Sequence, residues 1–355
     1  MTFGPDHYVP ILKVKRGEKA ALLALADPLC ARMTPLLEIV ERRSDKAATI
    51  GSHLDNAFKG LFESTMRFER VFLDAHEIAP EGPEAVMEVF RRAAAVGIEF
   101  TPVMGLSRTA DVSAALAFRS RGLCLRVVRA EFEGGDLRAT ITRFLNQYAF
   151  MPEEIDLILD MGPVEDMVSF GVAALALAFL AEVPALSQWR TLTLSGSAFP
   201  GSMGIVARHS YHRAERAEWL AWRDELYPHR GGMKRLPTYS DCAIQHPIGV
   251  EDFDPRLMTS SAVIRYTLDD FWLLIKGEST RRVFPSAQFP LLAVQLAYGH
   301  LRPFFDGNSH CAGCHAIKSA ADGGNGFGSL EVWRRIGTIH HLSKVSDGLS
   351  ALTWP

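Results

Sequence analysis

Short apolar runs alternate with amphipathic stretches along the first 250 residues of the chain. Each run is rich in leucine or β-branched residues, and most end in a polar or charged residue. The intervening stretches place apolar residues three and four positions apart, which is the spacing of an amphipathic helix. The apolar runs, which we predict to be β-strands, lie at residues 8–14, 34–40, 70–76, 100–106, 123–129, 155–161, 190–196 and 238–244.

This alternation predicts a parallel sheet whose strands are joined by crossover helices. Eight such units in a chain of this length favour a closed (β/α)8 barrel, a TIM-like fold of the α/β class. A doubly wound open sheet is the alternative, but it commonly carries a GxGxxG turn after its first strand. Here the first strand continues into KVKRGEKAAL, which lacks that turn.

The repeat stops after the eighth run, and a different set of elements follows. Residues 261–267 (SAVIRYT) and 271–277 (FWLLIKG) predict a hairpin, and residues 286–300 predict a helix. A loop rich in Gly, Asn and His is expected over 306–328, and a last helix is expected to begin after the N-cap Ser329.

Composition and segment boundaries indicate a single globular domain over residues 1–355. Of the 355 residues, 48% are hydrophobic and 22% are charged, and no linker-like segment interrupts them. We expect the barrel at about 8–250 and a C-terminal layer, made of the hairpin, the glycine-rich loop and the helices, at about 251–350. A formal net charge of -3 makes direct binding to the nucleic-acid backbone an unfavoured function.

The sequence predicts a cytoplasmic protein that does not enter a membrane. The N-terminal apolar run is only YVPIL, too short for a signal peptide. The longest apolar stretch, residues 170–186, is broken by Glu182 and Pro184 and is shorter than the roughly 20 residues of a membrane span. It therefore predicts a buried helix. Five scattered cysteines, an odd number, indicate a reduced chain.

Polar and charged residues stand where the predicted strands end, and in a barrel these ends meet at one mouth. Along the eight strands they are Lys13, Lys15, Glu38, Asp74, His76, Arg126, Arg129, Asp160, Ser195, Ser197, Asp241 and His246. The hairpin adds Arg265, Tyr266 and Lys276. We expect Lys13, Glu38, Asp74, Arg126, Asp160 and Asp241 to converge.

Two interpretations of this convergence remain open. The charges can pair with one another at a solvated rim, without chemical consequence. Alternatively they line a pocket in which carboxylates hold a divalent metal and cations bind an anionic substrate. Phosphoester or nucleotide chemistry would suit such a pocket, with His76 or His246 as general acid or base.

In the second interpretation the polar residues divide into two roles. The candidate catalytic residues are Asp74, Asp160, Asp241 and His246. The candidate ligand-binding residues are Lys13, Lys15, Glu38, Arg126, Ser195, Ser197, Arg265, Tyr266, Lys276 and His341.

The end of the chain refines two of these expectations. The hairpin is expected to present Arg265, Tyr266 and Lys276 in one direction. Because neighbouring helical residues point about 100° apart, at most one of His340 and His341 should face the pocket, and the other should be solvated or capping.

The sequence HCAGCH at 310–315 contains the pattern that attaches haem in c-type cytochromes. Such attachment occurs outside the cytoplasm, so without an export signal we expect no haem. Zinc requires four ligands, and Cys311, Cys314 and His315 would have to recruit His310, His340 or His341. A complete set is not evident from the sequence, so we expect no metal at these three residues.

Several segments, in this order, resemble the beta family, named for a beta protein of T-even bacteriophages. They include TPLLEIVE, WRTLTLSGSAFP, the IRYT...W...KG hairpin and WRRIGTIHHLSKV, and the resemblance runs from about Tyr8 to Val345. It implies a barrel protein found in phages and bacteria, often near mobile or defence genes, without an assigned catalytic activity. The chain departs from the family pattern at Cys314, where an aspartate is expected.

Three functional hypotheses follow. The first is a protein of phage and host conflict, in defence or counter-defence, with a pocket for a phosphate- or nucleotide-like anion at the barrel mouth. The second is a non-catalytic scaffold that binds a protein partner. The third is a pyridoxal-phosphate barrel enzyme with Lys13 as Schiff base, which rests on the position of that lysine alone.

Overall fold

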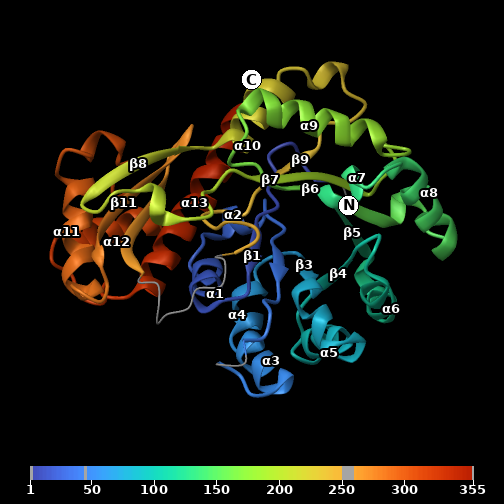
Figure 1. Cartoon of the computed structure of the whole chain (residues 1–355), viewed down its shortest axis with the longest axis horizontal. Helices are drawn as coiled ribbons and strands as arrows, with labels where there is room; N and C mark the ends of the chain where they lie inside the picture. Colours follow the sequence, from blue (N-terminus) through green and yellow to red (C-terminus); the bar gives the residue numbers. More distant parts are fainter. Residues whose placement is uncertain (1–2, 44–45, 250–259, 354–355) are drawn as a thin grey trace.

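All eight predicted apolar runs form strands of one parallel sheet, and the order of the strands follows the chain (Figure 1). The computed structural model describes residues 3–43, 46–249 and 260–353. The strands of this sheet are β1 (Ile11–Lys13), β2 (Leu36–Glu38), β3 (Val71–Asp74), β4 (Phe100–Met104), β5 (Leu123–Val128), β6 (Ile155–Pro163), β7 (Thr191–Ser197) and β9 (Thr238–Ser240).

The last strand meets the first, so the sheet curves into a nearly closed barrel. Val9 N donates to Tyr239 O at 3.1 Å, and Ile11 N donates to Asp241 O at 2.8 Å. The (β/α)8 prediction is therefore confirmed, and the open doubly wound sheet is excluded.

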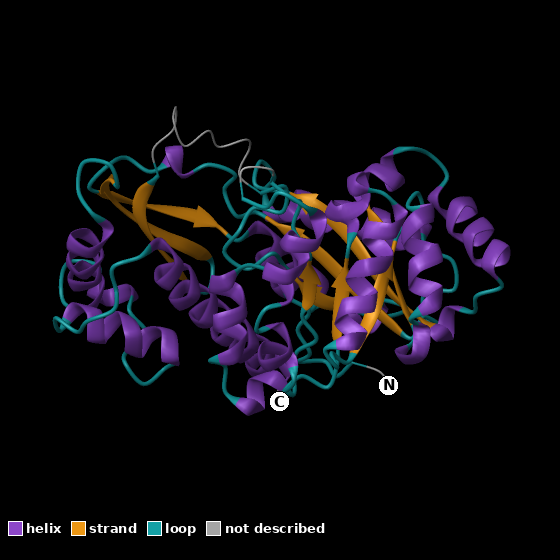
Figure 2. Ribbon diagram, turned by 90° about the horizontal axis from the view of Figure 1, so that it is seen from below, coloured by secondary structure: helices purple, strands orange, loops and turns teal. Residues whose placement is uncertain are grey.

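Helices cover the outside of the barrel strands (Figures 1 and 2). Their apolar faces pack on the outward-facing strand residues and form the main hydrophobic core. The helices are α1 (Arg16–Leu23), α2 (Asp27–Cys30), α3 (Ile50–Phe58), α4 (Leu61–Thr65), α5 (Pro83–Ala95), α6 (Thr109–Ala117), α7 (Arg129–Glu133), α8 (Leu137–Tyr148), α9 (Ser169–Glu182) and α10 (Ala217–Leu220).

Helix α9 corrects one expectation. The sequence predicts a buried helix here, but Phe170 is 71% exposed and Leu177 is 50% exposed, while Val172, Ala176 and Phe179 are buried. It is a surface helix with apolar residues on both faces. None of the described helices combines the length and the apolar character that a membrane crossing requires.

A smaller antiparallel sheet lies beside the barrel (Figure 2). Its strands have the order β10 (Ser261–Thr267), β11 (Phe271–Ser279) and β8 (Ser210–Glu215). The β10–β11 hairpin is the one predicted from the sequence. Strand β8 was not predicted, because it comes from the segment between two barrel strands and most of its side chains are exposed.

Three helices complete this C-terminal layer: α11 (Pro285–Ala297), α12 (Ala312–Ala321) and α13 (Leu330–Thr353). The prediction of a loop over 306–328 is wrong where α12 lies. Cys314, Ile317 and Ala320 have helical spacing and form the buried face of this helix. Before α13, Ser329 Oγ accepts a hydrogen bond from Val332 N at 3.2 Å, as its predicted capping role requires.

Helix α13 packs against both parts of the molecule. A Cβ added at Gly17, in α1, would lie 3.1 Å from the side chain of Arg334. A Cβ added at Gly337 would lie only 2.9 Å from the backbone oxygen of Arg265, in β10. The helix therefore passes closely between the barrel mouth and the small sheet, with glycine at the nearest approach.

Candidate functional site

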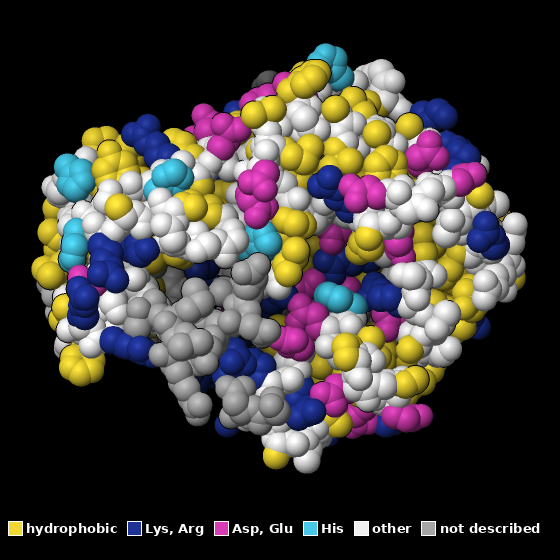
Figure 3. All heavy atoms as spheres, viewed as in Figure 1, with side chains coloured by type: hydrophobic (Ala, Val, Ile, Leu, Met, Phe, Trp, Pro, Cys, Tyr) yellow, Lys and Arg dark blue, Asp and Glu magenta, His cyan; other side chains and the backbone are white. Residues whose placement is uncertain are grey.

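A buried cluster of charges fills the carboxyl ends of the barrel strands. The Arg126 guanidinium lies at its centre and donates to Glu38 Oε1 at 2.7 Å, to Asp74 Oδ2 at 2.9 Å and to Asp160 Oδ2 at 2.6 Å. Lys13 Nζ lies 3.5 Å from Glu38 Oε2. All five side chains are buried. Acidic and basic side chains gather in a hollow on this face of the barrel (Figure 3).

Strand register explains why these side chains meet. Lys13, Glu38 and Asp74 are direct partners along β1, β2 and β3. Alternate residues of a strand point to the same side, so each of these residues shares the inner face with an apolar residue two positions earlier. Those earlier residues belong to the small apolar cluster inside the barrel, which contains Ile11, Leu36, Phe72, Cys124 and Ile158. The charged cluster lies next to this apolar cluster, on the side of the carboxyl ends of the strands.

The charges stabilise one another in their ionised forms. Burial alone would raise the pKa of Glu38, but Arg126 and Lys13 outweigh it and hold that pKa below its usual value. Asp74 is likewise buried, yet Arg108 and His76 hold its pKa well below the usual range. Burial lowers the pKa of Lys13, but Glu38 and Glu77 more than offset this and raise it.

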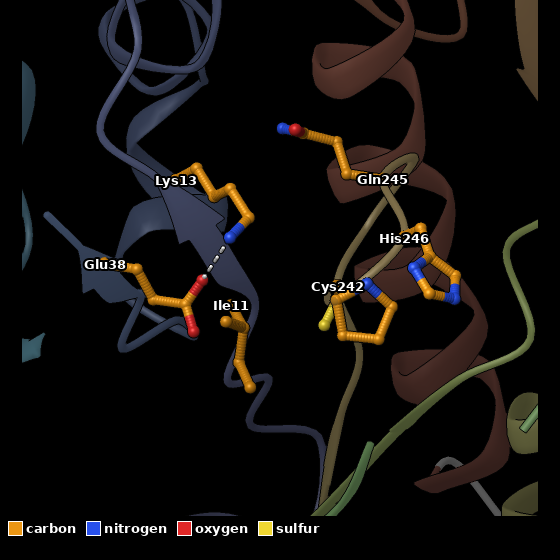
Figure 4. Close-up of a pocket in the computed structure, with 7 residues that line it drawn as sticks. Ile11, Lys13, Glu38, Cys242, Gln245 and His246 are labelled. Atoms are coloured by element: carbon orange, nitrogen blue, oxygen red, sulfur yellow. Dashed lines mark ion pairs between the residues drawn. The ribbon is translucent and has the colours of Figure 1, made fainter. Parts of the chain in front are cut away.

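Little free space remains in this cluster. A small cavity of about 10 Å³ is lined by Ile11, Lys13, Glu38, Cys242, Gln245, His246 and Pro247 (Figure 4). That volume is enough for about one water molecule. Lys13 and Glu38 face it from β1 and β2, and the loop after β9 closes the opposite side (Figure 4). Gln245, in this loop, donates to Glu18 of α1.

The remaining candidates near the barrel axis occupy varied surroundings. His246 Nε2 lies 2.9 Å from Glu165 Oε1, and His76 Nδ1 lies 3.5 Å from Asp74 Oδ1. Ser197 Oγ accepts from Phe199 N at 3.3 Å. Ser195 is buried, and its Oγ has no hydrogen-bond partner among the residues that the structure describes.

Asp241 does not join the Arg126 cluster. It accepts hydrogen bonds from the Tyr8 and Tyr239 hydroxyls, and its Oδ2 lies 3.0 Å from His341 Nε2. Cys242, its neighbour, lines the cavity instead. Successive residues of an extended chain point to opposite sides, so the aspartate faces outward toward α13. All six residues therefore lie at the carboxyl ends of the barrel strands, as expected, but the Asp241 side chain points outward and stays apart from the Arg126 cluster.

The hairpin and the last helix also distribute their side chains differently from expectation. Arg265 Nη1 donates to Ile244 O at 2.7 Å, whereas the Tyr266 hydroxyl donates to Asp306 Oδ2 at 3.2 Å on the opposite face of the strand. Lys276 donates to two backbone oxygens of the 203–206 segment. The three side chains therefore do not point in one direction.

His340 and His341 face different neighbours, as the helical geometry predicts, but both are completely buried, so the expectation that one is solvated or capping is wrong. His341 Nδ1 lies 3.0 Å from Thr267 Oγ1, and its Nε2 contacts Asp241. Burial lowers the pKa of His341, although Asp241 opposes this. This histidine belongs to the Asp241 network and not to the cavity.

Three cations form a second charged region, which we call the cation seam and define as Lys15, Arg265 and Arg334. Desolvation is the main cause that lowers the pKa of both Lys15 and Arg265; Glu18 opposes the shift, and the positive charge of Arg334 lowers both values further. Among the described residues, neither the Lys15 ammonium nor the Arg334 guanidinium has a hydrogen bond or an ion pair. Arg334 was not among the sequence candidates, because its position depends on how α13 packs.

The elements that build these regions come from both ends of the chain. Tyr8 and His341 share the Asp241 network, and Lys15 shares the cation seam with Arg334. A model of the family described as Beta protein matches residues 8–347, nearly the whole chain. The chain belongs to the Beta protein family. This confirms the resemblance seen in the sequence, and the matched range includes both ends of the Asp241 network. No curated protein matches the chain.

Glu218 is a buried carboxyl of this Beta family member that sequence analysis did not single out. Its Oε2 accepts from Ala198 N at 3.0 Å, and the Tyr239 hydroxyl lies 3.5 Å from Oε1. Burial raises the pKa of Glu218 to about 8, with Arg216 opposing and Asp241 reinforcing the shift. At neutral pH its protonated form therefore predominates.

The protonation of Glu218 predicts a loss of stability at alkaline pH. The pKa of about 8 in the folded state lies above the unfolded value of about 4.3, so the folded state binds an extra proton between these values. The free energy of unfolding should fall with rising pH in this window, by up to about 1.4 kcal/mol per pH unit. Urea titrations from pH 5 to pH 9 measure this. Glu218→Gln should flatten the profile, and parallel profiles for the two proteins would disprove the assignment.

Proposed function

We propose that this Beta family member binds a small phosphate- or nucleotide-like anion at the cation seam and acts in this way in phage and host conflict. The context of conflict comes from the family resemblance. The anion specificity comes from one observation: three cations gather between the barrel mouth and α13, and among the described residues none of them forms an ion pair with a carboxylate, although Glu18 lies close enough to oppose the lowering of the pKa of Lys15 and Arg265. Phosphate oxygens satisfy such groups by charge-assisted hydrogen bonds.

The surroundings of the three cations support this choice. Arg265 is half-buried, and its guanidinium lies 5.1 Å above the Phe199 ring while one nitrogen donates to Ile244 O. Its position is therefore fixed before any ligand arrives. Neighbouring protein atoms partly desolvate the Lys15 ammonium, but the residue as a whole is exposed, and Arg334 is half-buried, so both can be reached from solvent. The nearby carboxylate of Glu18 already accepts from Gln245.

In this proposal the Arg126 cluster has a structural role at the ends of the barrel strands and does not bind the ligand. Its arginine already contacts three carboxylates, and the adjoining cavity holds about 10 Å³. A divalent metal at these carboxylates would compete with Arg126 for the same oxygens. The alternative in which the charges pair with one another agrees with these contacts, except that the side chains are buried and not at a solvated rim. We therefore assign the cluster to holding the strand ends in place.

The pyridoxal-phosphate alternative fits this structure poorly. A Schiff-base lysine needs an accessible neutral amine, and nucleophilic lysines usually have a lowered pKa. Lys13 is buried between Glu38 and Glu77, which raise its pKa, and it faces a cavity far too small for a pyridine ring. We derive no step through this cofactor.

The proposal predicts that inorganic pyrophosphate binds at the seam. Calorimetric titration at constant ionic strength should show binding to the wild type and at least about ten-fold weaker binding to Lys15→Ala and Arg334→Ala, since a hydrogen bond to a charged group contributes about 1.5–3 kcal/mol. Arg335→Ala, one position along the same helix, removes the same charge and serves as the matched control. Because anion binding requires protonated Lys15, affinity should fall as pH rises through the lowered pKa of this lysine.

Equal loss of binding in Arg335→Ala would show that only net charge matters and would overturn the seam as a specific site. Absence of any heat of binding, for pyrophosphate and for adenosine diphosphate, would favour the alternative of a scaffold for a protein partner. Circular dichroism of each variant establishes that a lost signal is not lost folding.

A further inference from the structure

Two cysteines and two histidines meet where α12 begins beside α13. Cys314 Sγ lies 3.3 Å from His340 Nδ1, and Cys311 Sγ lies 3.7 Å from the same nitrogen. One ligand atom each of His310, Cys311 and His340 lies within 4.8 Å of the others. Within residues 3–43, 46–249 and 260–353, these three form the one such group of histidine, cysteine and carboxylate atoms.

We propose that His310, Cys311, Cys314 and His340 bind one Zn²⁺ ion. Two sulfurs and two imidazole nitrogens are the ligand set of many tetrahedral structural zinc sites. With Zn–S bonds of about 2.3 Å and Zn–N bonds of about 2.0–2.1 Å, a tetrahedral site separates sulfur from nitrogen by about 3.6 Å. The two measured separations from His340 Nδ1 lie on either side of that value.

The second nitrogen of His340 orients its ring for this role, and His310 leaves one buried nitrogen without a partner among the described residues. His340 Nε2 lies 2.8 Å from the backbone oxygen of Thr267, so it can donate there and leave the lone pair of Nδ1 directed at the sulfurs. His310 Nδ1 lies 3.9 Å from Asp347 Oδ2. Its Nε2 is buried and has no partner in the part of the chain that the structure describes. The hydrogen bond to Thr267 fixes the ring orientation of His340, as is usual for metal-binding histidines, whereas the separation of His310 from Asp347 is too long for such a bond.

The backbone positions the cysteines as well. Cys311 is the N-cap of α12, and its sulfur accepts from Cys314 N at 3.3 Å, an environment that favours the thiolate that metals bind. A Cβ at Gly313 would lie 2.7 Å from Ile336 O, so glycine at this position allows the turn to approach α13. The Tyr266 ring stacks on His340 with centroids 3.9 Å apart and closes another side.

His315, the histidine of the haem-like pattern, is not part of this group. Its Nδ1 lies 3.1 Å from Asn308 Oδ1, on the exposed side of α12. The sequence predicts no metal at Cys311, Cys314 and His315 because a fourth ligand is not evident from it. The fold replaces His315 with His310 and His340, of which the second lies 26 residues beyond Cys314.

Four protein ligands leave no open position, so the ion has a structural role. Zn²⁺ binds both cysteines as thiolates and displaces any proton that either sulfur still carries, and the two negative charges balance the ion so that the site is electrically neutral. The ion would join the start of α12 to the middle of α13. It is independent of the cation seam and of the function proposed for it.

The full-length chain, purified under reducing conditions without chelators, provides the test. Mass spectrometry of its metals should find one zinc per chain. Cys314→Ser and His310→Ala should lower zinc affinity at least ten-fold in competition with a chromophoric chelator. His315→Ala, a change within the same motif, should keep the affinity of the wild type.

Cobalt substitution tests the site in the wild-type protein, so the result does not depend on whether the variants fold. Wild-type protein loaded with Co²⁺ should show a thiolate-to-cobalt charge-transfer band and the visible spectrum of a tetrahedral site. Folded, reduced protein that takes up neither zinc nor cobalt overturns the proposal. So does a Cys311–Cys314 disulfide that forms in place of metal binding, or an equal loss of zinc in His315→Ala.

Discussion

Replacing Arg126 with methionine should lower the free energy of unfolding by about 3–5 kcal/mol, as expected when one partner of a buried ion pair is removed. The substitution leaves Glu38, Asp74 and Asp160 facing one another without their shared cation. All three are buried, so water cannot replace the lost hydrogen bonds without opening the barrel. Equilibrium unfolding in urea at neutral pH measures the change.

Arg129→Met is the matched control for this experiment. Arg129 is three residues further along and pairs with Glu133 at 2.6 Å on the surface of α7, where such a pair contributes about 0.3–0.5 kcal/mol. Arg126→Lys should fall between the two, because lysine keeps the charge but loses the planar arrangement of donors. Similar losses for Arg126→Met and Arg129→Met would show that the cluster does not hold the barrel mouth together.

Asp241→Ala should cost a similar amount, again about 3–5 kcal/mol, for a different reason. Asp241 accepts from two tyrosines and from Ala243 N, contacts His341, and lies 4.0 Å from Arg216. Its removal leaves the buried Arg216 guanidinium without the ionised carboxylate that pairs with it, because Glu218 in the same network is protonated at neutral pH. Asp224→Ala, which removes an exposed carboxylate paired with Arg223, is the control.

The contribution of Asp241 should also depend on pH in a defined direction. Its own burial opposes ionisation, but His341 and Arg216 hold the pKa of Asp241 well below its usual value. Because the folded pKa is lower than the unfolded value of about 3.9, the stabilisation is complete above that value and is lost as pH falls below it. The difference between wild type and Asp241→Ala should therefore shrink in acid. A constant difference from pH 7 to pH 3 would contradict this origin.

The barrel was predictable from the sequence because its strands are buried on both faces. Such strands appear as continuous apolar runs, and each of the eight runs became a strand. Strand β8 gave no such signal, since its sequence SYHRAE is mostly exposed and pairs only with the far hairpin. The sequence pattern of helix α12 was not recognised as helical because glycines and polar residues stand on either side of it.

The site was predictable only as far as strand ends and parallel register determine it. Those two rules bring Lys13, Glu38, Asp74, Arg126 and Asp160 together. They do not reveal which of Ser240, Asp241 and Cys242 points inward, because none of the three is strongly apolar. Contacts that depend on how the helices pack could not be predicted from the sequence. These include the place of Arg334 in the cation seam and of His340 beside the cysteines.

Helix α13 contributes side chains to three separate regions, so the number of helical residues between these side chains fixes the spacing of the regions. Arg334 contributes to the cation seam, His340 contacts the cysteines and His341 contacts Asp241. Inserting one residue after Arg334 would turn everything that follows by about 100°. Ile339 would then face the cysteines and His340 would face Asp241. Length variation among relatives should therefore accumulate in the glycine-rich turn at 323–328, while the segment from 334 to 341 keeps a constant number of residues.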